Sequence, residues 1–320
     1  AVHARRCGWL DAQQLGNVML QEAKESTAGA DMLVGWTVGA IHTAGGAVRG
    51  VTAYSASGEE VEIEAPVVVN AAGPYARDVH SLIDVAASLP DPFAALRVTN
   101  TLHSKAMLKD TLGIIPQESP MVISADPVEI PWSPEEKEAF AEAEEDDFQA
   151  LGPAWARAHA AALPAGAHFR PASAGWLVFV WEHAHAHVKA GTVRDKNHTK
   201  IIDYDAGEGG VNGQHTAPLC DPRMPGFYEE LVESRLDEIY PQMVLRAMAS
   251  LVPQLQPYAE AEAMTSPPVL DGGYYTQTSD SLPMIGPLSG DPGRGRDGIQ
   301  GYHLLCAFAG YGVMAADAAG

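Results

Sequence analysis

Residues 304–320 read LLCAFAGYGVMAADAAG, and the pattern of this stretch changes in its middle. An apolar run that is typical of a β-strand ends at Gly310-Tyr311-Gly312 and gives way to alanine-rich sequence that is typical of a helix. A strand that leads through a glycine turn into a helix presents free backbone N–H groups, which favour anionic ligands. The stretch therefore predicts one part of a binding site for a charged ligand.

A second stretch, PVVVNAAGP at residues 66–74, shows the same pattern of a strand, a glycine and the start of a helix. An uninterrupted valine run is typical of a strand buried on both faces, so we expect a parallel strand in the centre of a sheet. The run ends in Ala71, Ala72 and Gly73, where a ligand or another backbone can come close, and Pro74 can begin the next helix. The chain thus contains two strand-to-glycine-to-helix connections.

The charge balance excludes two classes of partner. The 320 residues include 41 Asp and Glu against 20 Lys and Arg, which gives a formal net charge of −21. Nucleic acids and anionic membranes are bound through Lys and Arg, so we expect neither as a partner. No run reaches the ~18 consecutive apolar residues of a membrane helix, which predicts no membrane insertion.

The cysteines indicate the compartment. Cys7, Cys220 and Cys306 lie far apart and fit neither a C-x-x-C metal pattern nor a disulfide framework. We therefore expect a reducing compartment, either the cytoplasm or the mitochondrial matrix.

The first part of the chain predicts a helix followed by a sheet. Apolar residues recur at helical spacing over residues 11–26. Runs rich in Val, Ile and Thr then follow at residues 32–42, 47–55 and 59–65, separated by glycine-containing turns. This pattern predicts a meander of antiparallel hairpins.

The middle of the chain, residues 84–267, differs in composition and contains many prolines. Ser133-Pro134-Glu135-Glu136 predicts a capping box that opens an acidic helix to about residue 147, with a solvated face as the preferred interpretation over a docking site for a basic partner. The run WLVFVW at residues 176–181 predicts a strand. Residues 226–251 predict a helix with an apolar core stripe, kinked or split at Pro241.

Five short motifs together resemble one family. They occur in the family's order at residues 8–11 (GWLD), 68–73 (VVNAAG), 168–171 (HFRP), 272–276 (GGYYT) and 310–314 (GYGVM). The chain resembles the FAD-dependent amine and amino-acid oxidoreductases that include D-amino-acid oxidase, glycine and sarcosine oxidases and dimethylglycine dehydrogenase.

The resemblance implies an α/β fold of mixed α+β character. The implied fold would consist of an incomplete FAD-binding domain of the glutathione-reductase type at residues 1–84 and 266–320, and of an inserted substrate domain with an antiparallel sheet at residues 85–265. It also implies FAD as the cofactor and a small amine or amino acid as the substrate. Gly273 falls near the place where sarcosine oxidases carry their flavin-attaching cysteine, so we expect the FAD to be bound non-covalently.

The resemblance further implies the site residues. Arg170 would bind a substrate carboxylate, and Tyr275 and Thr276 would line the substrate face of the flavin. The residues expected to bind the cofactor lie in the glycine-containing motifs: Ala71, Ala72, Gly73, Gly286, Gly310, Tyr311, Gly312, Val313 and Met314. A helix N-terminus at the last of these motifs would stabilise negative charge on the reduced flavin ring.

Each assignment has a structural alternative. The glycine turns can serve only to link strand to helix, and Arg170 can belong to a surface ion pair. Tyr275 can be a half-buried packing residue. His183, His185 and His187 would share one face of a strand and form a metal site, but no Cys or carboxylate partner is identifiable. We therefore predict no metal site and interpret the histidines as a polar strand face.

The chain also departs from the family pattern. No G-x-G-x-x-G unit precedes Gly8, and Leu282 stands where the relatives usually carry arginine. Two hypotheses follow. In the first, this is most of an oxidoreductase whose N-terminal FAD unit lies upstream or is supplied by another chain. In the second, it is a degenerate, non-catalytic subunit of a larger assembly.

Overall fold

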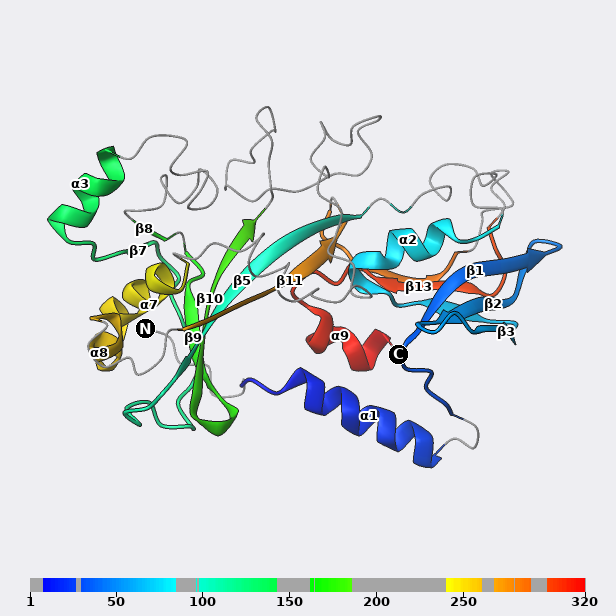
Figure 1. The fold of residues 1–320 in the computed structure, drawn as a ribbon, viewed down its shortest axis with the longest axis horizontal. Coiled ribbons are helices and arrows are strands. Elements are labelled where there is room, and N and C mark those ends of the chain that lie inside the picture. The colour runs from blue at the N-terminus through cyan, green and yellow to red at the C-terminus, as the bar shows by residue number, and fades with distance from the viewer. Residues whose placement is uncertain are drawn as a thin grey trace. The chain divides into compact units, whose positions relative to one another are not determined.

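A computed structural model describes most of the chain and gives it a mixed α/β fold (Figure 1). The chain forms two compact units, of which the first comprises residues 1–9, 101–201 and 212–274 and the second residues 10–100, 202–211 and 275–320. The structure describes residues 8–26, 30–84, 96, 98–142, 162–163, 165–185, 240–260, 268–278, 280–288 and 298–319. The predicted domain boundaries remain a prediction, and each unit is described by itself below.

The second unit begins with helix α1 (Ala12–Ser26), as predicted. Its N-terminus is capped by Asp11, whose Oδ1 accepts the backbone N–H groups of Gln13 and Gln14 at 3.0 Å each. None of its residues is buried.

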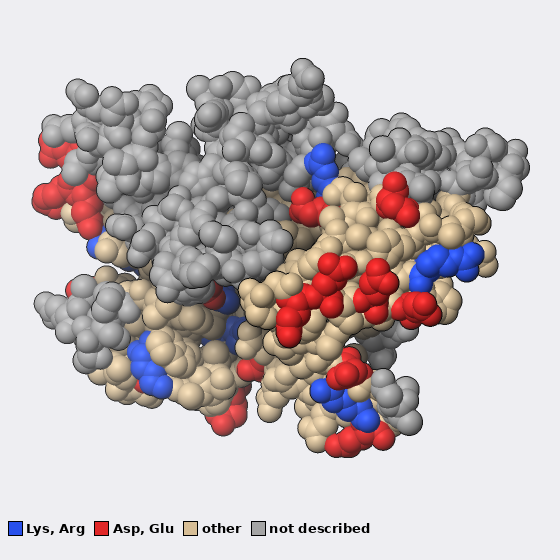
Figure 2. All heavy atoms as spheres, turned by 45° about the vertical axis from the view of Figure 1, so that its right-hand side comes forward, with Lys and Arg blue, Asp and Glu red and all other residues tan. Residues whose placement is uncertain are grey.

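The predicted hairpin meander is confirmed. Strands β1 (Trp36–Ala44), β2 (Ala47–Ser55) and β3 (Glu60–Glu64) form an antiparallel sheet in the order β1-β2-β3. The first strand begins at Trp36 and not at residue 32, because Gly35 turns the chain with a φ of +78° just before it. The edge strand β3 carries exposed glutamates that disfavour pairing with another strand. On the face of the molecule drawn in Figure 2, acidic side chains are more numerous than basic ones.

A second sheet of this unit contains both glycine connections. Its order is β12 (Met284–Pro287), β13 (Tyr302–Cys306), β4 (Val68–Asn70), with β13 antiparallel to β12 and parallel to β4. The parallel strand at the valine run is confirmed, but its expected central position and double burial are wrong. Within the described residues β4 is an edge strand, and Val67 and Val69 are 53% and 52% exposed. A run of identical valines hides the alternation between its inward and outward faces.

Each of these two parallel strands leads into a helix. The chain passes from β4 through the 3₁₀ turn η1 (Gly73–Tyr75) into α2 (Ala76–Ser81), and from β13 into α9 (Gly312–Ala319). The core of the unit packs beneath these elements and includes Ile41, Val48, Ala76, Ile83, Leu288, Ile299, Tyr302, Leu304 and Cys306.

The first unit is built on a five-stranded sheet. Its order is β11 (Val269–Gln277), β5 (Thr99–Lys109), β10 (Trp176–His185), β9 (His168–Ala172), β6 (Val122–Ile123), and the pairs formed by the last four strands are antiparallel. The 3₁₀ turn η3 (Ser173–Gly175) joins β9 to β10, and β7 (Val128–Glu129) pairs with β8 (Ala162–Leu163). The boundary between the units falls within β5 and β11.

One face of this sheet packs on helix α7 (Tyr240–Leu251), which is followed by η5 (Pro253–Leu255) and α8 (Gln256–Ala259). The Tyr240 hydroxyl donates to the Trp181 carbonyl at 3.0 Å and accepts the Trp181 N–H at 2.8 Å. Pro241 lies in the first turn of α7, where proline fits, and the kink or split expected at Pro241 stays a prediction. Residues 226–239 lie outside the described residues.

Helix α3 (Pro134–Glu142) carries the predicted capping box. The Ser133 N–H donates to Glu136 Oε2 at 2.8 Å, and the Glu136 N–H donates to Ser133 Oγ at 3.1 Å. Arg246 of α7 binds the same carboxylate at 2.7 Å and lies over the Trp132 ring at 4.6 Å. Over the described residues, no helix is both long enough and apolar enough to cross a membrane.

Candidate functional site

The two glycine connections lie at the same edge of one sheet. Strands β4 and β13 are parallel neighbours, with Asn70 opposite Leu304 in the register. The carboxyl ends of parallel neighbours meet at one edge, which is where open α/β sheets bind their ligands. The sequence predicted each connection separately, and the strand pairing brings the two together.

The connection after β4, here called the first turn, is held by a buried asparagine. Asn70 Nδ2 donates to the Ala76 carbonyl at 2.7 Å and to the Tyr302 hydroxyl at 2.8 Å, and its Oδ1 accepts the Ala72 N–H at 3.2 Å. Burial raises the pKa of Tyr302 to about 12, although the hydrogen bond from Asn70 acts in the opposite direction. Tyr302 is therefore a neutral structural group at physiological pH.

Gly73 gives the first turn its open surface. Its φ is +54°, a conformation that favours glycine, and a Cβ built on it would meet no atom within 4 Å. Gly286 of β12, opposite Leu304 in the register, has a φ of +121° and similarly open space. At both positions a ligand can approach the bare backbone.

The connection after β13, here called the second turn, is strained. Ala307 and Ala309 have φ values of +62° and +47°, which cost an alanine roughly 1–2 kcal/mol each. Such strain persists only where surrounding contacts impose it. The Ala309 N–H donates to the Thr276 carbonyl at 2.9 Å, and the Tyr311 N–H donates to the Phe308 carbonyl at 2.8 Å.

Tyr275 and Gly310 are in close contact. A Cβ on Gly310 would lie 3.2 Å from Cε2 of the Tyr275 ring, so glycine allows the ring to pack against the second turn. This contact brings one predicted catalytic residue to one predicted cofactor-binding residue.

Thr276 connects the two turns. Its buried hydroxyl donates to Asn100 Oδ1 at 2.7 Å, and Asn100 Nδ2 donates to the Pro74 carbonyl of the first turn at 2.9 Å. Because the Thr276 carbonyl also binds Ala309, one chain of hydrogen bonds runs from the first turn to the second. Asn100 and Tyr302 were missed as site residues. Asn100 stands between Thr99 and Thr101, so no local pattern singles it out.

The start of α9 exposes apolar side chains beside free backbone donors. Tyr311, Val313 and Met314 are 57%, 44% and 72% exposed. Helix geometry leaves the first N–H groups of α9 without intrahelical acceptors, and the helix dipole is positive at this end. The Gly312 position adds little bulk, since a Cβ there would meet only the Phe308 Cβ at 3.7 Å. A flat ring with an anionic edge fits this combination of donors and apolar surface.

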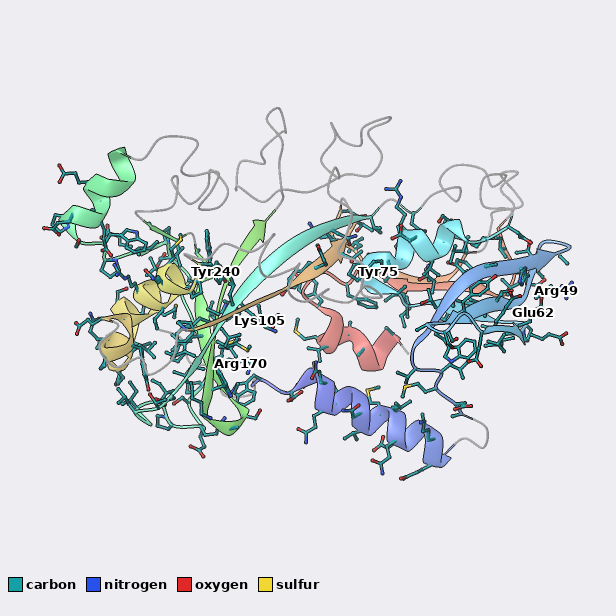
Figure 3. All side chains as sticks on the ribbon, viewed as in Figure 1. Arg49, Glu62, Tyr75, Lys105, Arg170 and Tyr240 are labelled. Carbon is teal, nitrogen blue, oxygen red and sulfur yellow. The ribbon has the colours of Figure 1, made fainter. Side chains whose placement is uncertain are left out.

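Arg170 belongs to the first unit and lies on the face of the five-stranded sheet opposite α7 (Figure 3). We call this the distal face. The register places its described side chains in two rows across β9, β10 and β5: Arg170, Val178 and Met107 in one row, and His168, Val180 and Lys105 in the other. The alternate residues Phe169, Phe179 and Ala106 belong to the core beneath α7.

The charged groups of the distal face have partners within their own unit. The Arg170 guanidinium lies over the Trp9 ring at 4.8 Å and donates to the Pro171 carbonyl at 3.0 Å. Lys105 Nζ lies 2.5 Å from Asp271 Oδ2 of β11. The Trp9 ring and the Pro171 carbonyl thus both contact the Arg170 guanidinium.

The described side chains include no group of three His, Cys, Asp or Glu residues that would hold a metal ion. His183 and His185 belong to β10, but their side chains are outside the described part of the structure, as is the whole of His187.

Comparisons with known proteins concern the fold. No protein-family model and no curated protein matches the chain. Among solved structures, L-proline dehydrogenase from P. horikoshii is 16% identical with a TM-score of 0.50, over 96% of this chain and 52% of that one. L-amino acid deaminase from Proteus myxofaciens is 15% identical with a TM-score of 0.41, over 98% and 68%. Glycine oxidase from Geobacillus kaustophilus is 15% identical with a TM-score of 0.41, over 90% and 47%.

The likeness to the proline dehydrogenase shows a shared fold. The TM-score for this pair reaches 0.50 over nearly the whole of this chain. The other two TM-scores are lower, and no inference about the fold is drawn from them. The chain spans about half of the length of that dehydrogenase.

Proposed function

We propose that the chain is part of a flavin-dependent oxidoreductase that oxidises the C–N bond of a small amine or amino acid, with FAD bound non-covalently. The observation that carries this proposal is the position of the two glycine turns at the carboxyl ends of neighbouring parallel strands. The order of the five sequence motifs and the fold shared with an L-proline dehydrogenase support it.

The second turn would hold the flavin ring. The N–H groups of Gly312, Val313 and Met314 would donate to the ring edge that carries negative charge after reduction, and the helix dipole would act in the same direction. Tyr311 and Met314 would cover the apolar part of the ring. When bound, the flavin supplies the two-electron acceptor for a hydride from the carbon beside the amine, and water then hydrolyses the resulting imine.

The first turn and β12 would bind the remainder of the cofactor. Ala71, Ala72 and Gly73 present small residues and open backbone, and Gly286 does the same on β12. Thr276 would act through its hydrogen bonds to both turns, and Tyr275 through its contact with Gly310. Arg170 would bind the substrate carboxylate.

A visible absorption spectrum of the purified chain, before and after denaturation, tests the proposal. We expect a flavin spectrum, or uptake of added FAD, with release of free FAD on denaturation. Gly312→Val should weaken FAD binding at least tenfold, because the new side chain would shield the N–H groups of α9 while meeting few protein atoms. Gly16→Val, on the exposed helix α1, is the matched control and should not alter FAD binding. A colourless chain that takes up no FAD would overturn the proposal and favour a non-catalytic subunit.

A measurement on Arg170 tests the substrate part. Arg170→Met should mainly raise KM for an amino acid, because it removes a contact to a carboxylate that does not react. Unchanged kinetics would remove Arg170 from the site.

A further inference from the structure

The sheet formed by β12, β13 and β4 is buried on one face and not on the other. The register places Tyr302, Leu304 and Cys306 on the face that packs with Ala76 of α2 in the core of the second unit. The alternate side chains lie on the opposite face, here called the open face: Val69, His303, Leu305, Ile285 and Pro287. None of these five side chains is buried, and Val69 and Ile285 are 52% and 50% exposed. An apolar face that remains in water is typical of an interaction site.

The open face has the composition of a surface that a helix covers. β4 and β13 are parallel neighbours, and sheets that contain parallel strands are normally covered by helices on both faces. In the second unit α2 packs on the buried face. The open face is apolar apart from His303 and therefore fits a further helix with an apolar stripe.

The outer edge of β4 offers backbone groups to a further strand. The Val68 N–H donates to the Gly301 carbonyl at 2.8 Å, and backbone direction alternates along a strand, so the Val69 N–H and C=O point away from β13. Among the described residues no strand pairs with β4 on this side. The edge strand β3 of the same unit is protected by three glutamates, whereas β4 carries no charged side chain. The edge of β4 is thus open to the addition of a strand.

A strand that is followed by a helix suits the edge and the open face together. A second copy of this chain suits them less well, because a twofold axis would pair two β4 strands antiparallel and leave the open face of both copies in water. The L-proline dehydrogenase shares the fold over 52% of its own length, so that protein contains further chain beyond the shared part.

We propose that β4 and the open face bind another polypeptide, which adds a parallel strand to β4 and lays a helix on the open face. The added strand hydrogen-bonds to the backbone of Val69 and makes β4 an internal strand of the sheet. The helix covers Val69, Leu305 and Ile285. Neither contact requires a bound flavin, so the inference does not depend on the proposed function.

A peptide that copies residues 300–319 is the probe, with Cys306→Ser to prevent disulfide formation. This segment is itself a strand, a turn and a helix, and its strand already pairs in parallel with the inner edge of β4. A peptide with the same residues in scrambled order is the control. Fluorescence anisotropy measures the binding of each labelled peptide to the purified chain without flavin. We expect the copied peptide to bind about tenfold more tightly than the scrambled one, and equal binding would overturn the inference.

Two variants of Val69 locate the binding. Val69→Pro removes the N–H that the added strand requires and leaves the bond between Val68 and Gly301 in place, so it should abolish binding of the copied peptide. Val69→Lys places a charge beneath the added helix and should weaken binding about tenfold. Ile63→Lys, at an exposed position of the edge strand β3, is the matched control and should not alter binding. Melting curves establish that each variant is folded, and unaltered binding by Val69→Lys would overturn the inference even if Val69→Pro does not fold.

Two further outcomes separate the alternatives. In ultracentrifugation we expect the unmodified chain and Val69→Pro to have the same oligomeric state, and self-association that Val69→Pro abolishes would overturn the inference in favour of a second copy. Peptide binding that depends on Val69, in a chain that takes up no FAD, would support the inference and refute the flavin proposal. A chain that takes up FAD but binds both peptides equally would overturn the inference alone.

Discussion

Replacing Asn70 by alanine should loosen the first turn more than any other single change in the sheet that holds it. Asn70 is buried and makes three hydrogen bonds, to the Ala76 carbonyl, the Tyr302 hydroxyl and the Ala72 N–H. A net contribution of about 1 kcal/mol from each bond gives a loss of about 3 kcal/mol. Because each 1.4 kcal/mol is a factor of ten, local opening of the turn becomes about 100-fold more frequent.

Hydrogen exchange followed by mass spectrometry measures this opening on the peptide that covers residues 68–81. Asn70→Ala should raise its exchange rate about 100-fold, within the range set by global unfolding. Tyr302→Phe removes only one of the three bonds and should raise the rate about fivefold. Asn17→Ala, on the exposed helix α1, should leave the rate unchanged. The reasoning is refuted if Asn70→Ala opens the peptide no more than Tyr302→Phe does.

Three further predictions concern other parts of the two units. Ala309→Gly should stabilise the second unit by about 1 kcal/mol against urea, because glycine accepts the φ of +47° without strain; a loss of stability would contradict the strain at this position. Burial raises the pKa of Cys306 to about 11, so alkylation of Cys306 by iodoacetamide at pH 8 should be slow in the native protein and fast in urea. Rapid labelling of the peptide that contains Cys306 in the native protein would be inconsistent with the burial of this thiol. The hydrogen bond from Arg246 lowers the pKa of Glu136, so this pair stabilises the fold above the ordinary carboxyl pKa, and the stabilisation is lost as the pH falls through the lowered pKa. Arg246→Met should therefore raise the pH midpoint of acid unfolding, and an unchanged midpoint would show that the pair does not stabilise the fold.

The local chemistry of the two turns could be predicted from the sequence. A strand pattern that stops at Gly73 or at Gly310 and continues as a helix is a property of neighbouring residues, and both connections form as expected. The cap of α1 and the capping box at Ser133 are equally local and were equally predictable.

What depends on tertiary pairing could not be predicted. Asn100 and Tyr302 reach the turns from 26 and 232 residues away in the chain, through hydrogen bonds that no local pattern indicates. The pairing of Lys105 with Asp271 likewise depends on the strand order of the five-stranded sheet. The valine run misled for a related reason, because identical residues at positions 67–69 conceal which side of the strand is exposed.

The roles of the site residues depend on where a flavin binds. The turns after β4 and β13 offer small residues, open backbone and one helix N-terminus at a common sheet edge. Thr276 and Asn100 fix the two turns relative to one another. These features suit a large anionic ring cofactor better than a small ion, because Tyr311, Val313 and Met314 add exposed apolar surface.

Photolabelling with 8-azido-FAD, followed by peptide mapping, tests the central claim most directly. The claim predicts that light attaches the flavin ring to residues 302–319 of the second turn and α9, and that excess FAD prevents the labelling. Labelling confined to other peptides, or labelling that excess FAD does not prevent, would contradict it.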